Sequence, residues 1–280
     1  MTSFSAPRPR VVAAVEIPEP LLQDLEHAEP RAEIVRAHDL YRPMRWPADW
    51  GGDPAARRSA EAQAAFEAMV DSADVLLSLP DADPAALART VRANPRLRWV
   101  HTMAAGGGAA VKAAGLTREE LDRVVFTTSA GVHGSTLAEF AVFGVLAGAK
   151  DLPRLRAAQE RREWNDRWLM RHLDEMTVLI VGLGGIGRAA AARFAAFGAT
   201  VWGTTRSGDP VPHVNRLVPI DDLAEAVRHV DAVVVTLPGT AHTEGLIGER
   251  VLRSARPGLI VANVGRGTVI DEAALLAALE

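Results

Sequence analysis

The sequence predicts an α/β fold made of two doubly wound, parallel-sheet domains of the Rossmann-like or flavodoxin-like kind. Short runs rich in valine and leucine alternate with alanine-rich or amphipathic segments. This alternation is typical of parallel strands joined by crossover helices. It occurs twice, and a glycine-rich break (AAGGG, residues 104–108) interrupts it. We therefore expect two domains, one over residues 1–108 and the other over residues 109–280.

The strands and helices of each half follow from the apolar runs and the residues that end them. In the first half, strands are expected at residues 11–17, 34–35, 75–79 and 97–102, and helices at residues 21–27, 61–70 and 84–93. A further strand is expected after the glycine-rich break, at residues 124–128. In the second half, strands are expected at residues 178–181, 200–202, 232–236 and 259–263, and helices at residues 186–197, 223–230, 248–254 and 271–280.

A long apolar segment lies between the two alternations. Thr136 and Glu139 have the spacing of a capping box, which predicts a helix that begins at Thr136 and runs to about Ala149. This helix is apolar on nearly every side, so it must be buried, and it is expected to pair two subunits in a homodimer. A polar connector that contains two tryptophans follows it.

The composition excludes several classes of site. The chain has 280 residues, of which 48% are hydrophobic and 24% charged, and it has no cysteine. Disulfides, thiolate zinc sites and cysteine nucleophiles are therefore excluded, and no metal site is predicted. The net charge of -4 is spread along the chain without a basic stripe. We therefore expect no nucleic-acid partner.

Neither a signal peptide nor a membrane span is predicted. The first apolar run, from Val11 to Val15, is too short for the core of a signal peptide, and Glu16 ends it. The apolar helix near residues 140–149 is much shorter than the roughly 20 residues that a span requires. We expect a cytoplasmic protein with no membrane partner.

The second half opens on a dinucleotide-binding motif, VLIVGLGGIG. Gly182, Gly184 and Gly187 have G-x-G-x-x-G spacing directly between an apolar strand and a helix. The first glycine permits the tight turn, the second lets the backbone approach a pyrophosphate, and the third allows close helix–strand packing. The alternative is a purely structural glycine turn. The predicted cofactor contacts of this segment are Gly182, Leu183, Gly184, Gly185, Ile186 and Gly187.

The end of the next strand, VWGTTRSG, bears on the choice of cofactor. Enzymes that use NAD place an acidic residue there, which binds the ribose 2′-hydroxyl. This chain has Thr205 at that position, followed by Arg206 and Ser207. An arginine can pair with a 2′-phosphate through its planar fork. We therefore favour NADP, with NAD as the other possibility and Arg206 as a solvated loop residue as the alternative interpretation.

Four further segments resemble the D-isomer-specific 2-hydroxyacid dehydrogenases of the glyoxylate/hydroxypyruvate reductase kind. They are AVVVTLPGTAHTEGLI, IVANVGRGTVIDEAALLAAL, LRWVHTMAAGGG and GSTLAEFAVFGVLA. The resemblance covers most of the chain from about Val75 onward. It implies an oxidoreductase that transfers a hydride between NAD(P)H and a small 2-oxo or 2-hydroxy acid of the glyoxylate or hydroxypyruvate class. Residues 1–108 would then be its substrate domain and residues 109–280 its dinucleotide-binding domain.

The resemblance also implies roles for single residues. Arg266 would be the catalytic arginine, which holds the substrate carboxylate and polarises its carbonyl. Backbone N–H groups of Ala105 and Gly106 would bind the substrate carboxylate, although Gly107 and Gly108 depart from the usual residues of that loop. The remaining cofactor contacts would be Leu237, Pro238 and Thr243.

A second departure is expected at the C-terminus. The family continues with a catalytic Glu and a His that protonates the new hydroxyl, and this segment is absent from the 280 residues. The alternative function is therefore a non-catalytic dinucleotide-binding protein derived from the family. His101, on a strand near the substrate loop, is the first other candidate for a proton donor, although a packed core histidine is the simpler interpretation.

Overall fold

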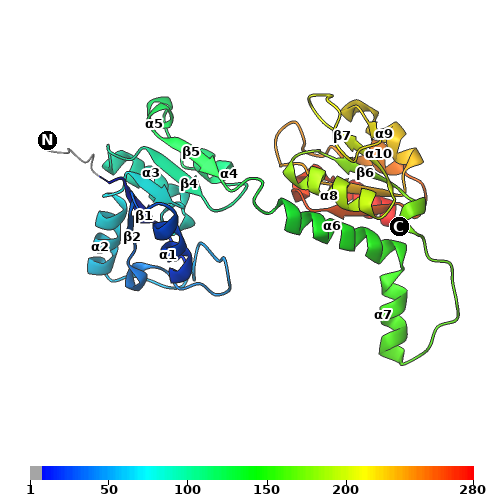
Figure 1. Cartoon of the computed structure of the whole chain (residues 1–280), viewed down its shortest axis with the longest axis horizontal. Coiled ribbons are helices and arrows are strands. Elements are labelled where there is room, and N and C mark those ends of the chain that lie inside the picture. Colours follow the sequence, from blue (N-terminus) through cyan, green and yellow to red (C-terminus); the bar gives the residue numbers. More distant parts are fainter. Residues whose placement is uncertain (1–7) are drawn as a thin grey trace. The chain divides into compact units, whose positions relative to one another are not determined.

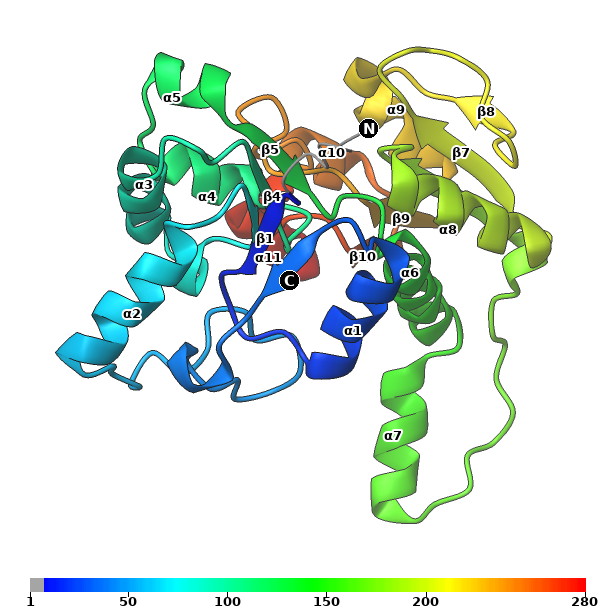
Figure 2. The same ribbon diagram turned by 60° about the vertical axis from the view of Figure 1, so that its left-hand side comes forward.

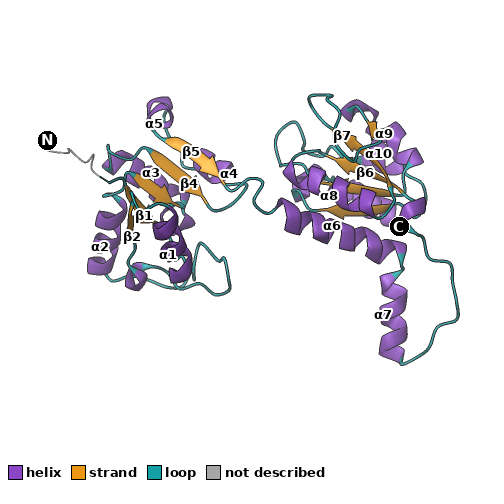
Figure 3. Cartoon of the chain, in the orientation of Figure 1, coloured by secondary structure: helices purple, strands orange, loops and turns teal. Residues whose placement is uncertain are grey.

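The structure, a computed structural model, describes residues 8–280 and divides into two compact units, the first ending at Ala130 and the second beginning at Gly131 (Figure 1). Each unit contains one five-stranded sheet in which all paired strands run parallel. In each unit, helices pack around the strands (Figure 3). The predicted architecture of two doubly wound parallel sheets is therefore confirmed.

The first unit has the strand order β2-β1-β3-β4-β5. Its strands are β1 (Arg10–Ala13), β2 (Glu33–Val35), β3 (Val75–Leu77), β4 (Trp99–Thr102) and β5 (Val125–Thr128). Its helices are α1 (Glu19–Ala28), α2 (Ala60–Val70), α3 (Pro84–Ala93), α4 (Gly108–Ala113) and α5 (Arg118–Arg123). This order is that of flavodoxin-like folds.

The second unit has the strand order β10-β9-β6-β7-β8. Its strands are β6 (Thr177–Val181), β7 (Thr200–Thr204), β8 (Arg216–Leu217), β9 (Ala232–Val235) and β10 (Ile260–Asn263). Its helices are α6 (Gly134–Ala149), α7 (Leu152–Arg161), α8 (Gly185–Ala196), α9 (Leu223–Ala226), α10 (Glu249–Ser254) and α11 (Glu272–Leu279). This order is that of dinucleotide-binding Rossmann folds, without the sixth strand.

The boundary between the units lies further along the chain than the sequence predicts. A boundary after residue 108 falls inside the first unit, which continues to Ala130. The reason is β5, which pairs in parallel with β4 from Trp99–Val125 to Thr102–Thr128. Strand pairing joins residues that are distant in sequence, so the glycine-rich break at residues 104–108 is a loop within the first sheet and not a linker.

The central strand β6 shows why its sequence is continuously apolar. Val178 and Ile180 belong to a core cluster with residues of α6 and α8, whereas Leu179 and Val181 belong to a second cluster with residues of α9 and α10. Successive side chains of a strand point to opposite faces, and here helices cover both faces. Every position of β6 after Thr177 is therefore buried.

The long apolar helix differs from its prediction in two ways. It begins at Gly134, so Thr136 lies inside its first turn and caps nothing, whereas a capping box occurs in α5, between Thr117 and Glu120. One side of α6 packs against α8 and β10. The other side is uncovered in this chain, with Phe140 63% and Phe143 52% exposed. This face of the helix is therefore uncovered in the single chain, and its expected burial between two subunits stays a prediction.

The predicted polar connector contains a further helix, α7, and forms an arm that projects from the rest of its unit (Figure 2). The base of the arm is closed by two hydrogen bonds. Lys150 Nζ donates to the Arg171 carbonyl at 2.6 Å, and the Arg171 N–H donates to the Ala149 carbonyl at 3.1 Å.

Among residues 8–280, no helix combines the length and the apolar character that crossing a membrane requires.

Candidate functional site

The sheet of the second unit has a topological switch point beside β6. The chain leaves β6 for β7 and β8 on one side and returns to β9 and β10 on the other. In open α/β sheets, ligands bind outside the carboxyl ends of the strands at such a point. The site residues predicted for this unit all lie in the loops that follow β6, β7, β9 and β10 or in the first turn of α8.

Two glycines of the loop after β6 are required by the packing of the chain itself. Gly182 has a φ of +107°, and a Cβ there would lie 2.7 Å from Leu237 Cδ2. A Cβ on Gly187 would lie 2.0 Å from the carbonyl oxygen of Gly182 and 3.2 Å from Ile180 Cγ2. The turn and the seating of α8 against β6 therefore exclude any side chain at these two positions.

Gly184 is different, because no close contact among the described residues 8–280 excludes a side chain there. It is exposed, and a Cβ there would meet no heavy atom within 4 Å. It precedes the first turn of α8, whose N–H groups receive no side-chain cap. Such a helix N-terminus attracts an anion. The open approach above Gly184 and these N–H groups fit the pyrophosphate of a dinucleotide.

The segment after β7 faces solvent. Thr205 is half-buried, whereas Arg206 and Ser207 are exposed. The hydroxyls of Thr205 and Ser207 lie 3.4 Å apart, and Ser207 Oγ accepts the N–H of Asp209 at 3.3 Å. Arg206 forms no ion pair with any residue in the described range 8–280. Its guanidinium is therefore available to an external anion.

The loops after β9 and β10 cross in close contact. A Cβ on Gly265 would lie 2.4 Å from the Leu237 carbonyl oxygen, so only glycine permits this crossing. A Cβ on Gly239 would lie 3.3 Å from Arg266 Cβ. Arg266 therefore lies directly beside the loop that carries Leu237 and Pro238.

Side chains within each loop hold it in place. Thr243 Oγ1 donates to the Pro238 carbonyl at 2.6 Å, so this hydroxyl braces its own loop. The Asn263 side chain binds the backbone of Gly265 and of Arg266. Its Oδ1 accepts the Gly265 N–H at 2.9 Å, and its Nδ2 donates to the Arg266 carbonyl at 3.1 Å. The Arg266 side chain is exposed and donates to the neighbouring Gly265 carbonyl at 3.3 Å. Its remaining donors can meet a planar anion.

In the first unit, the loop after β4 contains two exposed residues whose N–H groups are not bound by a backbone carbonyl of residues 8–280. Ala105 and Gly106 are exposed, and within residues 8–280 no backbone carbonyl accepts from either N–H. A Cβ on Gly107 would lie 1.8 Å from Thr102 Oγ1, which accounts for the glycine at this position. A Cβ on Gly108 would meet nothing within 4 Å. The departure at Gly107 is thus explained by close packing inside this loop.

His101 is held by two hydroxyl groups. Its Nδ1 lies 2.9 Å from Thr127 Oγ1, and its Nε2 lies 3.1 Å from Ser129 Oγ. Thr127 Oγ1 also accepts the indole N–H of Trp99 at 2.7 Å. With both ring nitrogens occupied, His101 fits the interpretation of a packed, hydrogen-bonded histidine better than that of a proton donor.

Comparison with known proteins identifies the second unit. The family model described as "D-isomer specific 2-hydroxyacid dehydrogenase, NAD binding domain" matches residues 142–280. Residues 142–280 therefore belong to the D-isomer-specific 2-hydroxyacid dehydrogenase family, as its NAD-binding domain. The predicted dinucleotide loop and the segment around Arg266 both lie within the matched range.

Relatives of this dehydrogenase family differ in the substrate that their names state. Glyoxylate reductase from Thermococcus gammatolerans is 30% identical over 196 residues, which cover 66% of this chain and 57% of that protein. D-3-phosphoglycerate dehydrogenase from Mycobacterium bovis is 32% identical over 157 residues, which cover 56% of this chain and 29% of that protein. The chain therefore spans less than two thirds of the length of these curated relatives.

Two solved members of the family share the fold of the whole chain. A family protein from Aeromonas salmonicida superposes with a TM-score of 0.76 at 25% identity and covers 97% of this chain and 77% of its own. A dehydrogenase from Xanthobacter autotrophicus, in complex with NADPH and MES, has a TM-score of 0.71 at 28% identity, with the same coverage of 97% and 77%.

Sequence reasoning missed three polar side chains that organise this dehydrogenase site. Thr204 and Thr236 bind the two peptide groups of Gly182, and Asn263 binds on both sides of Arg266. The two threonines do have a signal, since each is a polar residue at the end of an otherwise apolar strand. Asn263 begins the Asn-x-x-Arg-Gly segment, but its contacts are not readable from that spacing.

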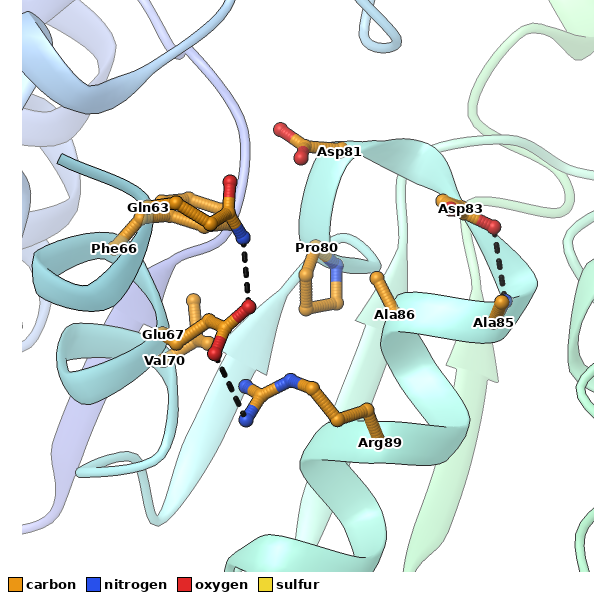
Figure 4. A pocket seen from close by; sticks show the side chains of 10 residues that line it. All are labelled: Gln63, Phe66, Glu67, Val70, Pro80, Asp81, Asp83, Ala85, Ala86 and Arg89. Carbon is orange, nitrogen blue, oxygen red and sulfur yellow. Dashed lines mark hydrogen bonds and ion pairs between the residues drawn. The ribbon is translucent and has the colours of Figure 1, made fainter. Parts of the chain in front are cut away.

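A pocket in the first unit lies between α2 and α3 and is lined by none of the predicted site residues (Figure 4). Its polar groups satisfy one another. Gln63 Nε2 donates to Glu67 Oε1 at 2.8 Å, and Glu67 Oε2 lies 3.8 Å from an Arg89 nitrogen. The Asp83 carboxylate caps α3 through the Ala85 N–H at 2.9 Å. The Asp81 carboxylate accepts two hydrogen bonds from Arg58, both at 2.7 Å.

Proposed function

We propose that this chain is an NAD(P)H-dependent reductase of small 2-oxo acids of the glyoxylate or hydroxypyruvate class, with NADPH preferred. The observation that supports this most directly is the position of Arg266. Its exposed guanidinium lies beside the loop of Leu237 and Pro238, at the same sheet edge as the open approach over Gly184. A cofactor and an anionic substrate can therefore meet at one place.

The proposed chemistry divides between cofactor and protein. A bound nicotinamide cofactor supplies the hydride that reduces the 2-oxo carbonyl to a hydroxyl. Arg266 pairs with the substrate carboxylate and stabilises the negative charge that develops on the carbonyl oxygen. Arginine stays protonated near neutral pH, so it does not deliver the proton that this oxygen must gain. A separate acid or water completes the reaction.

The remaining site residues have supporting roles in this proposal. The N–H groups of Ala105 and Gly106 bind the substrate carboxylate, as the family resemblance implies. Arg206 pairs with the 2′-phosphate of NADPH, and Thr205 and Ser207 offer hydroxyls without the charge that would repel it. The same segment does not exclude NADH, which lacks that phosphate.

The test is a pair of measurements on the same preparation. Isothermal titration calorimetry gives the affinity for NADPH and NADH, and the absorbance of NADPH follows its oxidation with glyoxylate or hydroxypyruvate. Binding together with 2-oxo acid reduction supports the proposal. Binding without reduction favours the alternative of a non-catalytic dinucleotide-binding protein. Absence of binding refutes both.

We also propose that the chain forms a homodimer through α6. Phe140 and Phe143 form an exposed pair of tilted rings with centroids 5.9 Å apart. Exposed aromatic pairs of this kind on an apolar helix are typical of protein–protein contacts. A second copy of the chain would cover this face with the same surface, as two-fold pairing requires.

A further inference from the structure

We propose that Thr204 is a positioning residue for the dinucleotide, which joins the phosphate-binding loop to the ribose-binding segment. This inference rests on the proposed cofactor binding. Thr204 ends β7 and is 3% exposed, so it does not itself reach a ligand. Its importance lies in the two loops that it connects.

Thr204 holds two consecutive N–H groups of the phosphate-binding loop. Its Oγ1 accepts the Gly182 N–H at 2.9 Å, and its carbonyl oxygen accepts the Leu183 N–H at 2.9 Å. Both groups are thereby directed toward β7. The loop then continues to Gly184 and to the uncapped first turn of α8, which face the open space above the sheet.

Thr236, on the opposite side of the loop from Thr204, binds the carbonyl group of Gly182. Its hydroxyl donates to the Gly182 carbonyl, and its N–H donates to the Val181 carbonyl at 3.0 Å. Both peptide groups of Gly182 are thus bound by threonines from the two strands that flank β6. Gly182 has a φ of +107°, which glycine adopts without strain, and these contacts restrict the backbone freedom that glycine otherwise has.

Thr204 also precedes the segment that is expected to choose between the two cofactors. Thr205, Arg206 and Ser207 follow it directly, so a shift of Thr204 moves both the phosphate loop and the ribose segment. NADPH and NADH share the pyrophosphate and differ in the 2′-phosphate. A defect at Thr204 should therefore weaken both cofactors, whereas a defect at Arg206 should weaken NADPH alone.

The decisive comparison is between Thr204→Val and Thr204→Ser in the full chain. Valine places a methyl group where Oγ1 accepts the Gly182 N–H, and a buried N–H without an acceptor is costly. We expect about tenfold weaker binding of both NADPH and NADH by isothermal titration calorimetry. Serine keeps the hydroxyl and loses only a buried methyl, so it should lower the unfolding midpoint while most of the affinity remains.

Thr200→Val is the matched control, because Thr200 lies on the same strand and is exposed. It should leave both affinities unchanged. If Thr204→Val does not fold, the pair Thr236→Val and Thr236→Ser replaces it. Valine at 236 releases the Gly182 carbonyl and should weaken both cofactors, and serine at 236 should restore binding.

The outcomes separate this inference from the cofactor proposal on which it rests. Wild-type affinity in Thr204→Val overturns the inference and leaves cofactor binding intact. Equal losses in Thr204→Val and Thr204→Ser also overturn it, because serine keeps the hydroxyl, and retaining that group would then not preserve cofactor affinity. A wild type that binds neither dinucleotide refutes the cofactor proposal, and Thr204 then has no ligand to position.

Discussion

Gly187 lies so close to Gly182 that a Cβ on Gly187 would stand 2.0 Å from the Gly182 carbonyl oxygen. Gly184, which lies between them in the sequence, would place a Cβ in open space. Glycine therefore occurs at the three positions of this motif for different physical reasons. Two are required by the folding of the chain, and the third is consistent with a requirement from outside the chain.

Gly187→Ala should destabilise the fold. The new methyl group meets a backbone carbonyl oxygen and not a flexible side chain, so α8 must move away from β6. Overpacking of this kind typically costs about 1–3 kcal/mol or more. Urea unfolding followed by circular dichroism measures this loss. An unchanged free energy of unfolding would contradict the packing described for Gly182 and Gly187.

Gly184→Val should leave the stability of the fold nearly unchanged and abolish dinucleotide binding. The side chain enters empty space, so the free energy of unfolding should change little, apart from a small loss because Gly184 is the N-cap of α8 and valine is a poorer N-cap than glycine. The same side chain should block the approach of the pyrophosphate and abolish dinucleotide binding in calorimetry. Gly108→Val is the control, since a Cβ there also meets nothing within 4 Å. Unchanged affinity for NADPH in Gly184→Val would refute the placement of the phosphate site.

Arg206→Glu should change cofactor preference. Loss of a charge-assisted pair with the 2′-phosphate should weaken NADPH binding by roughly 1–3 kcal/mol, with little effect on NADH. Arg253→Glu, an equally exposed change of charge on α10, controls for the altered net charge. Tighter binding of NADH than of NADPH by the wild type would show that Arg206 is a solvated loop residue.

Phe140→Asp should dissociate the proposed dimer. A carboxylate in the centre of an apolar interface is left without a partner, and that cost opposes association. Light scattering at micromolar concentration should give a dimer mass for the wild type and a monomer mass for the variant. Phe197→Asp is the matched control, because Phe197 is 50% exposed on the same unit but lies at the end of α8. A monomeric wild type would exclude α6 as a dimer interface.

Arg266→Lys should impair 2-oxo acid reduction far more than His101→Gln. Lysine keeps the charge but loses the fork that binds a carboxylate and a carbonyl oxygen together, and loss of such a donor costs about 100- to 1000-fold in kcat. His101 already uses both ring nitrogens within the first unit. Steady-state rates of NADPH oxidation, normalised to cofactor affinity, compare the two. A larger loss in His101→Gln would make His101 the proton donor.

Much of the fold was readable from the sequence because its signals are local. The apolar strands of the second unit lie within one or two residues of their predicted bounds, and Gly182, Gly184 and Gly187 lie between β6 and α8 as expected. The features that the sequence predicted wrongly, such as the start of α6, depend on how neighbouring segments fold. The helix α6 begins at Gly134 and not at Thr136, because the chain already turns at Gly131, whose carbonyl accepts the Gly134 N–H at 3.2 Å.

The sequence by itself determined the alternation of strands and helices, the dinucleotide motif and the presence of an arginine after the last strand, since each is a pattern of neighbouring residues. The tertiary structure decided which side chains hold these features in place. Thr204 binds Gly182 across 22 positions of the chain, and Gly265 touches Leu237 because parallel strands bring their carboxyl ends to one edge. Contacts of this kind arise only when the sheet assembles, so no local pattern encodes them.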